Sequence, residues 1–316
     1  MSGASPGRAL ICGSVAFDTI MVFGDRFANH ILPDKIHMLN VSFLVPQMRR
    51  EYGGCAGNIA YNLRLLGGEG LIMATVGHDF GPYAHWLRER GIALTHVREL
   101  PGEFTAQAYI TTDLDGNQIT AFHPGAMNHA HVNHVNEAAG VRLGIIAPDG
   151  RQGMLEHAAQ FAAAGIPYMF DPGQALPLFN GEELRSLVER ASWVAVNDYE
   201  ASLLSEHSGW SAAEIAGRVK ALVITRGGEG SVIHAGGTAH EIPVARPAQL
   251  ADPTGCGDAY RAGLLYGLQR GLDWPTTGRI AALAGAIKIE HHGTQHHQFD
   301  WPGFAARYRQ EFGASP

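Results

Sequence analysis

Residues 252–258 read Asp-Pro-Thr-Gly-Cys-Gly-Asp, and the helical run Ala-Tyr-Arg-Ala-Gly-Leu-Leu follows at once. Small residues at a helix start let backbone N–H groups approach an anion closely, and the helix dipole favours negative charge there. A phosphate therefore fits the amides of Gly255, Cys256 and Gly257. Because a carboxylate does not bind phosphate, Asp258 is better suited to accept a proton from an attacking hydroxyl. The alternative is a Gly-rich turn with Asp258 as a helix N-cap.

Short apolar strands alternate with helical segments in the second half of the chain. The predicted strands are 144–147, 168–170, 193–196 and 222–225, and further helices are expected at about 256–270, 276–289 and 304–312. This alternation predicts right-handed crossovers and an α/β fold with a mainly parallel central sheet.

The first half of the chain contains extended segments that a purely parallel sheet does not accommodate. We expect an opening strand over Ala9–Val22 that is broken by Gly13, extended residues at 36–50, a helix at about 56–66, and a hairpin over 108–123 around Asp115-Gly116-Asn117. A small sheet that covers a cleft at the carboxyl ends of the parallel strands explains the extended segments. The expected organisation is one domain, 1–316, with lid segments at about 30–52 and 105–125.

Charge and hydropathy exclude several classes of partner. The 316 residues include 23 basic and 30 acidic side chains, a formal charge of −7, with no Lys/Arg block. Nucleic acid and membrane partners are therefore not expected. Apolar runs end well short of the roughly 20 residues of a membrane span, and no secretory leader is recognisable, so we expect a cytoplasmic protein.

The cysteines and histidines give no metal pattern. Cys12, Cys55 and Cys256 are far apart, with no C-x-x-C pair, so we expect reduced thiols. Histidines cluster at 129–134 and 291–297 without an Asp, Glu or Cys partner at a familiar spacing, so solvated loop histidines are expected rather than a metal site. Cys256 at a helix start should have a lowered thiol pKa.

The segment 252–258 resembles the second signature of the ribokinase-like, or PfkB, carbohydrate and nucleoside kinases, Asp-Thr-x-Gly-Ala-Gly-Asp. Pro253 and Cys256 depart from the commonest pattern, and Cys256 puts a thiol among the phosphate-binding amides. The resemblance implies a three-layer α/β/α domain with a small β-sheet lid. It also implies ATP as phosphoryl donor and Asp258 as catalytic base.

Two further matches carry the resemblance toward the N-terminus. Tyr-Gly-Gly-Cys-Ala-Gly-Asn at 52–58 is similar to the family's Gly-Gly motif, which implies substrate contacts at Gly53, Gly54 and Asn58. By itself the Gly pair could equally be a structural turn. Asp18 corresponds to the family's early substrate Asp, which accepts hydrogen bonds from paired sugar hydroxyls, although a strand-end Asp can also cap a turn.

Two more matches concern the nucleotide. Asn197-Asp198-Tyr199-Glu200 resembles the Asn-x-x-Glu motif, which implies that Asn197 and Glu200 organise Mg²⁺ through water; a plain capping sequence is the alternative. The loop at 225–230 resembles one that lies along ATP, through Thr225, Arg226, Gly227 and Gly230. The resemblance also allows a monovalent cation such as K⁺ near residues 252–257, which we call the anion loop.

Absent motifs narrow the possibilities. Neither a G-x-x-x-x-G-K-[ST] loop nor a G-x-G-x-x-G at the first crossover is present, which argues against P-loop kinases and dinucleotide dehydrogenases. Residues 52–58 and 122–127 look more similar to adenosine and nucleoside kinases than to sugar kinases.

We therefore expect phosphorylation of a primary hydroxyl of a nucleoside, with adenosine converted to AMP. Phe17, Phe43 and Phe122 are candidates to stack on a base, or are ordinary core residues. A sugar kinase of the ribokinase or fructokinase type is the first alternative. A nonenzymatic nucleoside or sugar sensor is the second. Either a monomer or a homodimer formed through the lid is expected.

Overall fold

A large sheet forms the centre of the protein. The computed structural model describes residues 7–31 and 40–316, and its nine-stranded sheet has the order β13-β12-β11-β10-β9-β8-β1-β4-β5. The bounds are β1 Arg8–Cys12, β4 Gly70–Gly77, β5 Ala93–Leu100, β8 Val141–Ile146, β9 Tyr168–Phe170, β10 Trp193–Asn197, β11 Ala221–Thr225, β12 Ser231–Ala235 and β13 Thr238–Ile242. Neighbours from β5 to β11 are parallel, whereas β12 and β13 are antiparallel, so the mainly parallel sheet is confirmed.

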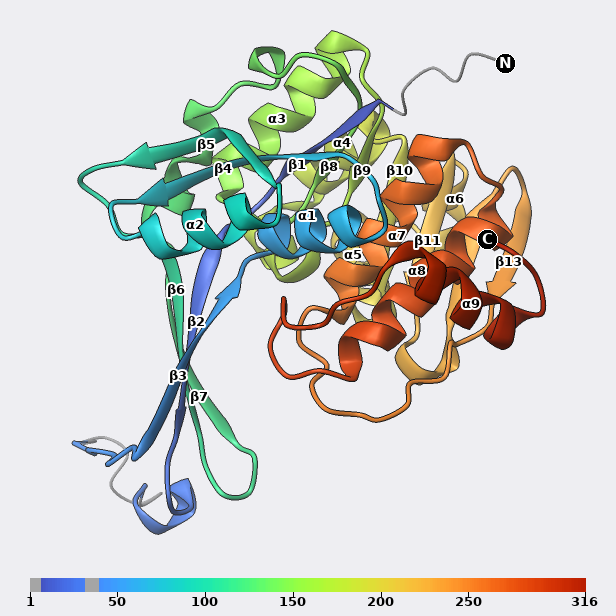
Figure 1. Ribbon diagram of the computed structural model, residues 1–316. Coiled ribbons are helices and arrows are strands. Elements are labelled where there is room, and N and C mark those ends of the chain that lie inside the picture. The colour runs from blue at the N-terminus through green and yellow to red at the C-terminus, as the bar shows by residue number, and fades with distance from the viewer. Residues whose placement is uncertain (1–6, 32–39) are drawn as a thin grey trace.

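Helices cover both faces of this sheet and make three layers (Figure 1). Along β1, Ala9 and Ile11 face one apolar core while Leu10 and Cys12 face the other, as the period of two in a strand requires. The first core is closed by α1 Cys55–Leu65, α2 Gly81–Glu89, α7 Cys256–Arg270, α8 Trp274–Ile289 and α9 Trp301–Phe312. The second is closed by α3 Arg151–Ala164, α4 Gly181–Arg190, α5 Asp198–Ser208 and α6 Ala212–Ala216.

A second, four-stranded sheet extends away from the main body as a lid (Figure 1). Its order is β3-β2-β6-β7, with β2 Ala16–Val22, β3 Gln47–Gly53, β6 Ala106–Thr112 and β7 Gln118–His123. The predicted hairpin is β6 and β7, which pair in antiparallel register. The lid segment predicted at about 30–52 contains β3, but residues 32–39 lie outside the described residues.

The opening stretch predicted as one strand over Ala9–Val22 with a break at Gly13 is two separate strands. The chain leaves the main sheet after Cys12 and enters the lid at Ala16, so the stretch forms β1 and β2 in different sheets. The connecting residues Gly13, Ser14 and Val15 are buried, so the connection between the two strands is short and has no exposed polar run. Consequently Asp18 belongs to the lid and not to the main sheet.

No helix within residues 7–31 and 40–316 combines the length and the apolar character that crossing a bilayer requires.

Candidate active site

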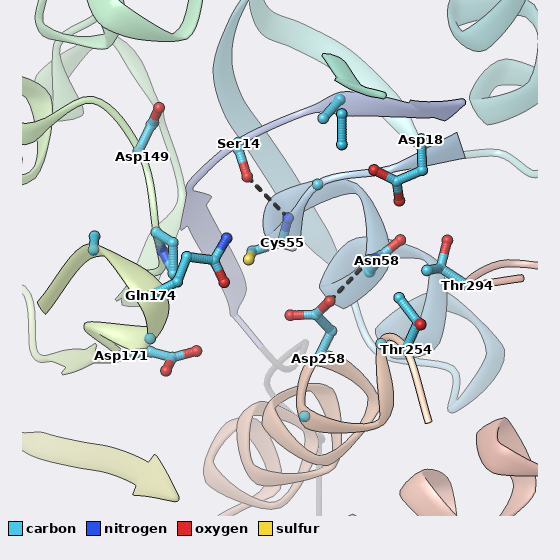
Figure 2. A pocket seen from close by; sticks show the side chains of 18 of the residues that line it. Ser14, Asp18, Cys55, Asn58, Asp149, Asp171, Gln174, Thr254, Asp258 and Thr294 are labelled. Atoms are coloured by element: carbon cyan, nitrogen blue, oxygen red, sulfur yellow. Dashed lines mark hydrogen bonds between the residues drawn. The ribbon is translucent and has the colours of Figure 1, made fainter. Parts of the chain in front are cut away.

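A cavity of about 660 Å³ lies between the lid, the carboxyl ends of the central strands and the start of α7. Strand-end residues form one wall, Ala16, Asp18, Ala108, Ile110 and Phe122 of the lid form another, and the anion loop and first turn of α7 form the third. Figure 2 shows the polar side chains that point into this space. The predicted site residues among its lining are Asp18, Gly54, Asn58, Glu200, Gly255, Gly257 and Asp258.

Asp258 lies in the first turn of α7 beside Asn58, whose Nδ2 donates a 2.8 Å hydrogen bond to Oδ2 of the carboxylate (Figure 2). Burial raises the pKa of Asp258 to about 7, which the Asn58 bond and the Arg261 guanidinium oppose and the Asp171 carboxylate supports. A base with a pKa near neutrality is matched to accept a proton at physiological pH.

The Asn58 amide is hydrogen-bonded on the side away from Asp258 to a network of buried and half-buried side chains that no sequence motif indicated. Gln295 Nε2 donates to Asn58 Oδ1 at 3.0 Å and to the Tyr83 hydroxyl at 2.5 Å, and Gln295 Oε1 accepts from Trp86 Nε1 at 3.0 Å. The Tyr83 hydroxyl in turn donates to the carbonyl of Gly53 at 3.0 Å. This network fixes which end of the Asn58 amide faces Asp258.

Asp18 faces the cavity from β2 and lies against the Gly pair where β3 leads into α1. Its Oδ2 would lie 2.5 Å from a Cβ at Gly53, so any side chain at that position displaces the carboxylate. Gly54 has φ +84°, a conformation that other residues rarely adopt. Burial raises the pKa of Asp18 to about 6, with further contributions from the Glu51 and Asp252 carboxylates.

The amides of the predicted anion loop, Gly255, Cys256 and Gly257, differ in their hydrogen bonds. Gly255 has φ +80° and is the N-cap of α7, and among the described residues its N–H and that of Gly257 make no backbone hydrogen bond. The Cys256 N–H, in contrast, donates to the carbonyl of Pro253 at 3.2 Å. In this structure the Gly255 and Gly257 amides are therefore free, whereas the Cys256 amide is bonded within the loop.

The prediction of a lowered Cys256 pKa is also wrong. Burial raises the pKa of the thiol to about 11, because loss of solvent outweighs the nearby Lys288 ammonium. The Asp252 and Asp258 carboxylates act in the same direction as burial. All three cysteines are free thiols, as expected.

Asn197 and Glu200 form a capping box at the start of α5. Asn197 Oδ1 accepts from the Glu200 N–H at 2.7 Å, and Glu200 Oε2 accepts from the Asn197 N–H at 2.8 Å. This is the geometry of the capping alternative, and Glu200 also lines the cavity whereas Asn197 does not. Burial is the main cause that raises the pKa of Glu200.

Behind Glu200 lies a buried ion pair that sequence reasoning missed. Arg261 donates to Asp171 Oδ1 at 3.0 Å and lies 3.8 Å from Glu200 Oε2. Arg261 follows Asp258 by one helical turn and is only 4% exposed. It therefore ties the second turn of α7 to Asp171 after β9 and to Glu200 in the first turn of α5.

The predicted nucleotide loop lies after β11 and outside the lining of this cavity. Thr225 ends the strand, Arg226 pairs with Glu241, and Gly227 and Gly230 have φ values of +54° and +84°. A Cβ at Gly230 would lie 2.3 Å from the carbonyl oxygen of Ile242, so glycine is required there. The loop shares with the cavity the carboxyl-end edge of the sheet.

Comparison with known proteins decides the family. The model of the pfkB family carbohydrate kinases matches residues 18–301, most of the chain. The chain belongs to this family.

The solved structures and relatives that this pfkB-family kinase matches include nucleoside kinases. The nucleoside kinase of Burkholderia thailandensis in complex with inosine is 52% identical, with a TM-score of 0.89 over 98% of this chain and 99% of that one. The Methanocaldococcus jannaschii nucleoside kinase structure is 30% identical, with a TM-score of 0.86 over 98% of this chain and 100% of that one. A curated M. jannaschii nucleoside kinase is 33% identical over 83% of this chain and 87% of its own length. The predicted ribokinase-like fold and kinase activity are thereby confirmed.

The three aromatic candidates of this pfkB-family kinase have different surroundings. Phe17 is fully buried and packs with Tyr52 and Tyr83, so it is a core residue and not a stacking surface. Phe43 packs with Phe23 in the lid. Phe122 is 51% exposed and lines the cavity, so it alone of the three is available to a ligand there.

The histidine clusters of the kinase form no group of metal-binding side chains within the described part of the chain. The expectation of solvated histidines is wrong for His297, which is fully buried and hydrogen-bonded through Nε2 to Asn62 Oδ1 at 2.7 Å. Burial lowers the pKa of His297 to about 3, so it is neutral in the folded protein. Its role is in the core between α1 and the C-terminal segment.

Proposed function

We propose that this pfkB-family kinase transfers the γ-phosphoryl group of ATP to the primary hydroxyl of a nucleoside, with adenosine as substrate and AMP as product. The observation that carries the proposal is the position of Asp258 between the start of α7 and a cavity whose far wall holds Asp18. Asp258 accepts the hydroxyl proton, and the free amides of Gly255 and Gly257 stabilise charge on the transferred group.

The proposed ribose site is formed by the lid and α1. Asp18 accepts hydrogen bonds from the paired ribose hydroxyls, next to Gly53 and Gly54, which leave room for them. Asn58 is proposed to contact the substrate and also to orient Asp258 through its 2.8 Å hydrogen bond. In this arrangement the bound substrate bridges the lid and α7. Closure of the lid then excludes water from the phosphoryl transfer.

The proposed nucleotide site is the edge of the sheet next to the anion loop. Thr225, Arg226, Gly227 and Gly230 are proposed to lie along ATP, and Asn197 and Glu200 to organise Mg²⁺ through water, for which the Glu200 carboxylate at the cavity wall is suited. The Mg²⁺ ion would neutralise phosphate charge. Because both side chains already cap α5, binding through water fits them better than direct coordination.

A nucleoside is preferred over a sugar because the cavity continues past the proposed ribose site along apolar side chains. Ile110, Phe122 and Met127 line this part, and they offer contact surface for a base that a free sugar lacks. The similarity to the B. thailandensis enzyme, whose structure holds inosine, supports a purine nucleoside. A sugar kinase of the ribokinase or fructokinase type is the alternative for the acceptor.

The lid also bears on assembly. Its exposed large apolar side chains include Met48, Tyr109, Ile119 and Phe122, which favours the homodimer through the lid over the monomer. Sedimentation of the protein with and without nucleoside distinguishes the two.

We place the enzyme in the cytoplasm, where ATP is available and its three free thiols stay reduced.

The test is release of ADP with adenosine, inosine, cytidine, ribose and fructose as acceptors. We expect the highest kcat/KM with a purine nucleoside, whereas a preference for a free sugar, or no ADP release with any acceptor, would contradict the proposal.

Asp258→Asn should keep nucleotide and nucleoside binding within a few-fold and lower kcat by at least about a hundredfold. The control Glu206→Gln, on the exposed face of α5, should leave kcat unchanged.

A further inference from the structure

A buried lysine lies beside the anion loop. Lys288 is in the last turn of α8 and its side chain is fully buried. Its Nζ donates to the backbone carbonyl of Asp252 at 2.8 Å and to that of His291 at 3.1 Å. An ammonium group is costly to remove from water unless oxygen acceptors replace its hydration. The protein therefore holds this charge in place with main-chain carbonyls.

Asp252 is the first residue of the anion loop, and hydrogen bonds to its backbone and to its carboxylate hold it in place. The N–H groups of Ala251 and Asp252 both donate to the Ile289 carbonyl, at 2.8 and 3.1 Å. The Asp252 carboxylate accepts from the Thr254 N–H at 2.9 Å and from the Gly293 N–H at 3.0 Å. The ammonium thus binds where the end of α8 meets the chain that leads into Gly255.

The same carbonyl connects the ammonium to the first turn of α7. Cys256 Sγ lies 4.0 Å from the carbonyl oxygen of Asp252. Burial lowers the pKa of Lys288, while Cys256 and the Asp252 carboxylate act in the opposite direction. A positive charge at this place also favours anions bound at the neighbouring amides.

A separate monovalent cation does not fit beside this loop. Main-chain carbonyl oxygens are the ligands that proteins offer to such ions in place of water. Here the carbonyls of Asp252 and His291 already hold an ammonium, and a second cation next to it would meet a like charge in a low-dielectric site. The residues present therefore disagree with the K⁺ ion that the family resemblance allows.

We propose that Lys288 is a built-in monovalent cation that positions the anion loop, so that phosphoryl transfer by this enzyme needs no K⁺. Lys288 acts through the Asp252 carbonyl on the Gly255 and Gly257 amides and is a positioning residue. The proposal rests on the proposed kinase function for its kinetic readout, but thermal stability in different salts tests it without any turnover.

The experiment compares wild type, Lys288→Met and Lys288→Ala in chloride salts of K⁺, Na⁺ and tetramethylammonium at one ionic strength. Met keeps much of the buried volume without the charge, and Ala leaves space for a free cation. The control is Lys220→Met, because Lys220 is exposed just before β11. Initial rates, nucleotide affinity and Tm are measured for each protein.

We expect wild type and the control to have rates within about twofold and equal Tm in all three salts. Lys288→Met should lose at least about tenfold in kcat in every salt, as expected for a misplaced anion loop. Lys288→Ala should be similarly slow in tetramethylammonium and recover, in both rate and Tm, with a saturable dependence on K⁺ or on added ethylammonium.

Three results would overturn the proposal. They are a saturable K⁺ activation of the wild type, a normal kcat for Lys288→Met, or a Lys288→Ala protein that neither K⁺ nor ethylammonium restores in rate or Tm. If no acceptor is phosphorylated by the wild type, the proposed function fails, yet the salt dependence of Tm in Lys288→Ala still decides the role of Lys288.

Discussion

Replacing Asn58 with leucine should move the pH dependence of the enzyme upward. The Asn58 Nδ2 bond to Asp258, 2.8 Å long, stabilises the ionised carboxylate, whose pKa burial raises to about 7. A hydrogen bond to a charged group contributes about 1.5 to 3 kcal/mol, and about 1.36 kcal/mol corresponds to one pKa unit. The pKa of Asp258 should therefore rise by about 1 to 2 units in Asn58→Leu.

The sign and size of the rate effect follow from the ionised fraction of the base. At pH 7 about half of the wild-type Asp258 is ionised, and the shift reduces this fraction about 5- to 50-fold. The acid limb of kcat/KM reports ionisation of the free enzyme, so it should move from about pH 7 to about pH 8 or 9, with much of the rate recovered at high pH.

The assay is kcat/KM for adenosine from about pH 5.5 to about pH 9.5, with Tm measured at each pH. Asn62→Leu is the matched control, because Asn62 is also buried on α1 but bonds to His297 and to the backbone carbonyl of Asn58, with no bond to Asp258. The control should lose stability without moving the limb. An acid limb of Asn58→Leu that stays in place or moves down would refute the assignment of Asp258 as the titrating base held by Asn58.

Two further predictions concern the substrate and the anion loop. Wild type should use 2′-deoxyadenosine much less well than adenosine, since each lost bond to a buried carboxylate costs about 1 to 3 kcal/mol, and Asp18→Ala should shrink that difference; equal kcat/KM of the two nucleosides in the wild type would remove Asp18 from this role. Cys256, with its pKa raised to about 11 by burial, should react with iodoacetamide more slowly at neutral pH than a free thiol and faster as pH rises, while Cys256→Ala stays active; rapid labelling of Cys256 at neutral pH by peptide mapping would contradict this.

Short motifs made much of the site predictable. Asp18, Asn58 and Asp258 are far apart in sequence, yet each belongs to a local pattern of small residues with a defined backbone requirement, such as φ +84° at Gly54 and φ +80° at Gly255. The structure brings all three around one cavity. Their roles stay predictions until the variants above are measured.

The supporting residues were not predictable because no local pattern marks them. Gln295 and Lys288 act through tertiary contacts: Gln295 bonds to Asn58, and Lys288 bonds to the carbonyl of Asp252. Both partners are distant in sequence. The sequence around Lys288 predicts an ordinary buried helix, α8. One lysine among its apolar residues does not indicate which carbonyl groups accept hydrogen bonds from it. In the same way, the break at Gly13 does not reveal that the chain changes sheets there, since the connecting residues 13–15 are buried like most of β1.

The distribution of lysines has a practical consequence for attaching this protein to a solid support. The sequence contains only Lys35, Lys220 and Lys288, and among the described residues Lys220 is the one whose amine is exposed to a coupling reagent. Lys220 precedes β11 at the amino ends of the parallel strands, whereas the cavity opens at their carboxyl ends. In a Lys35→Arg variant whose N-terminal amine is blocked, coupling through Lys220 would therefore anchor the protein on the side opposite the cavity, with the substrate entrance facing the solution.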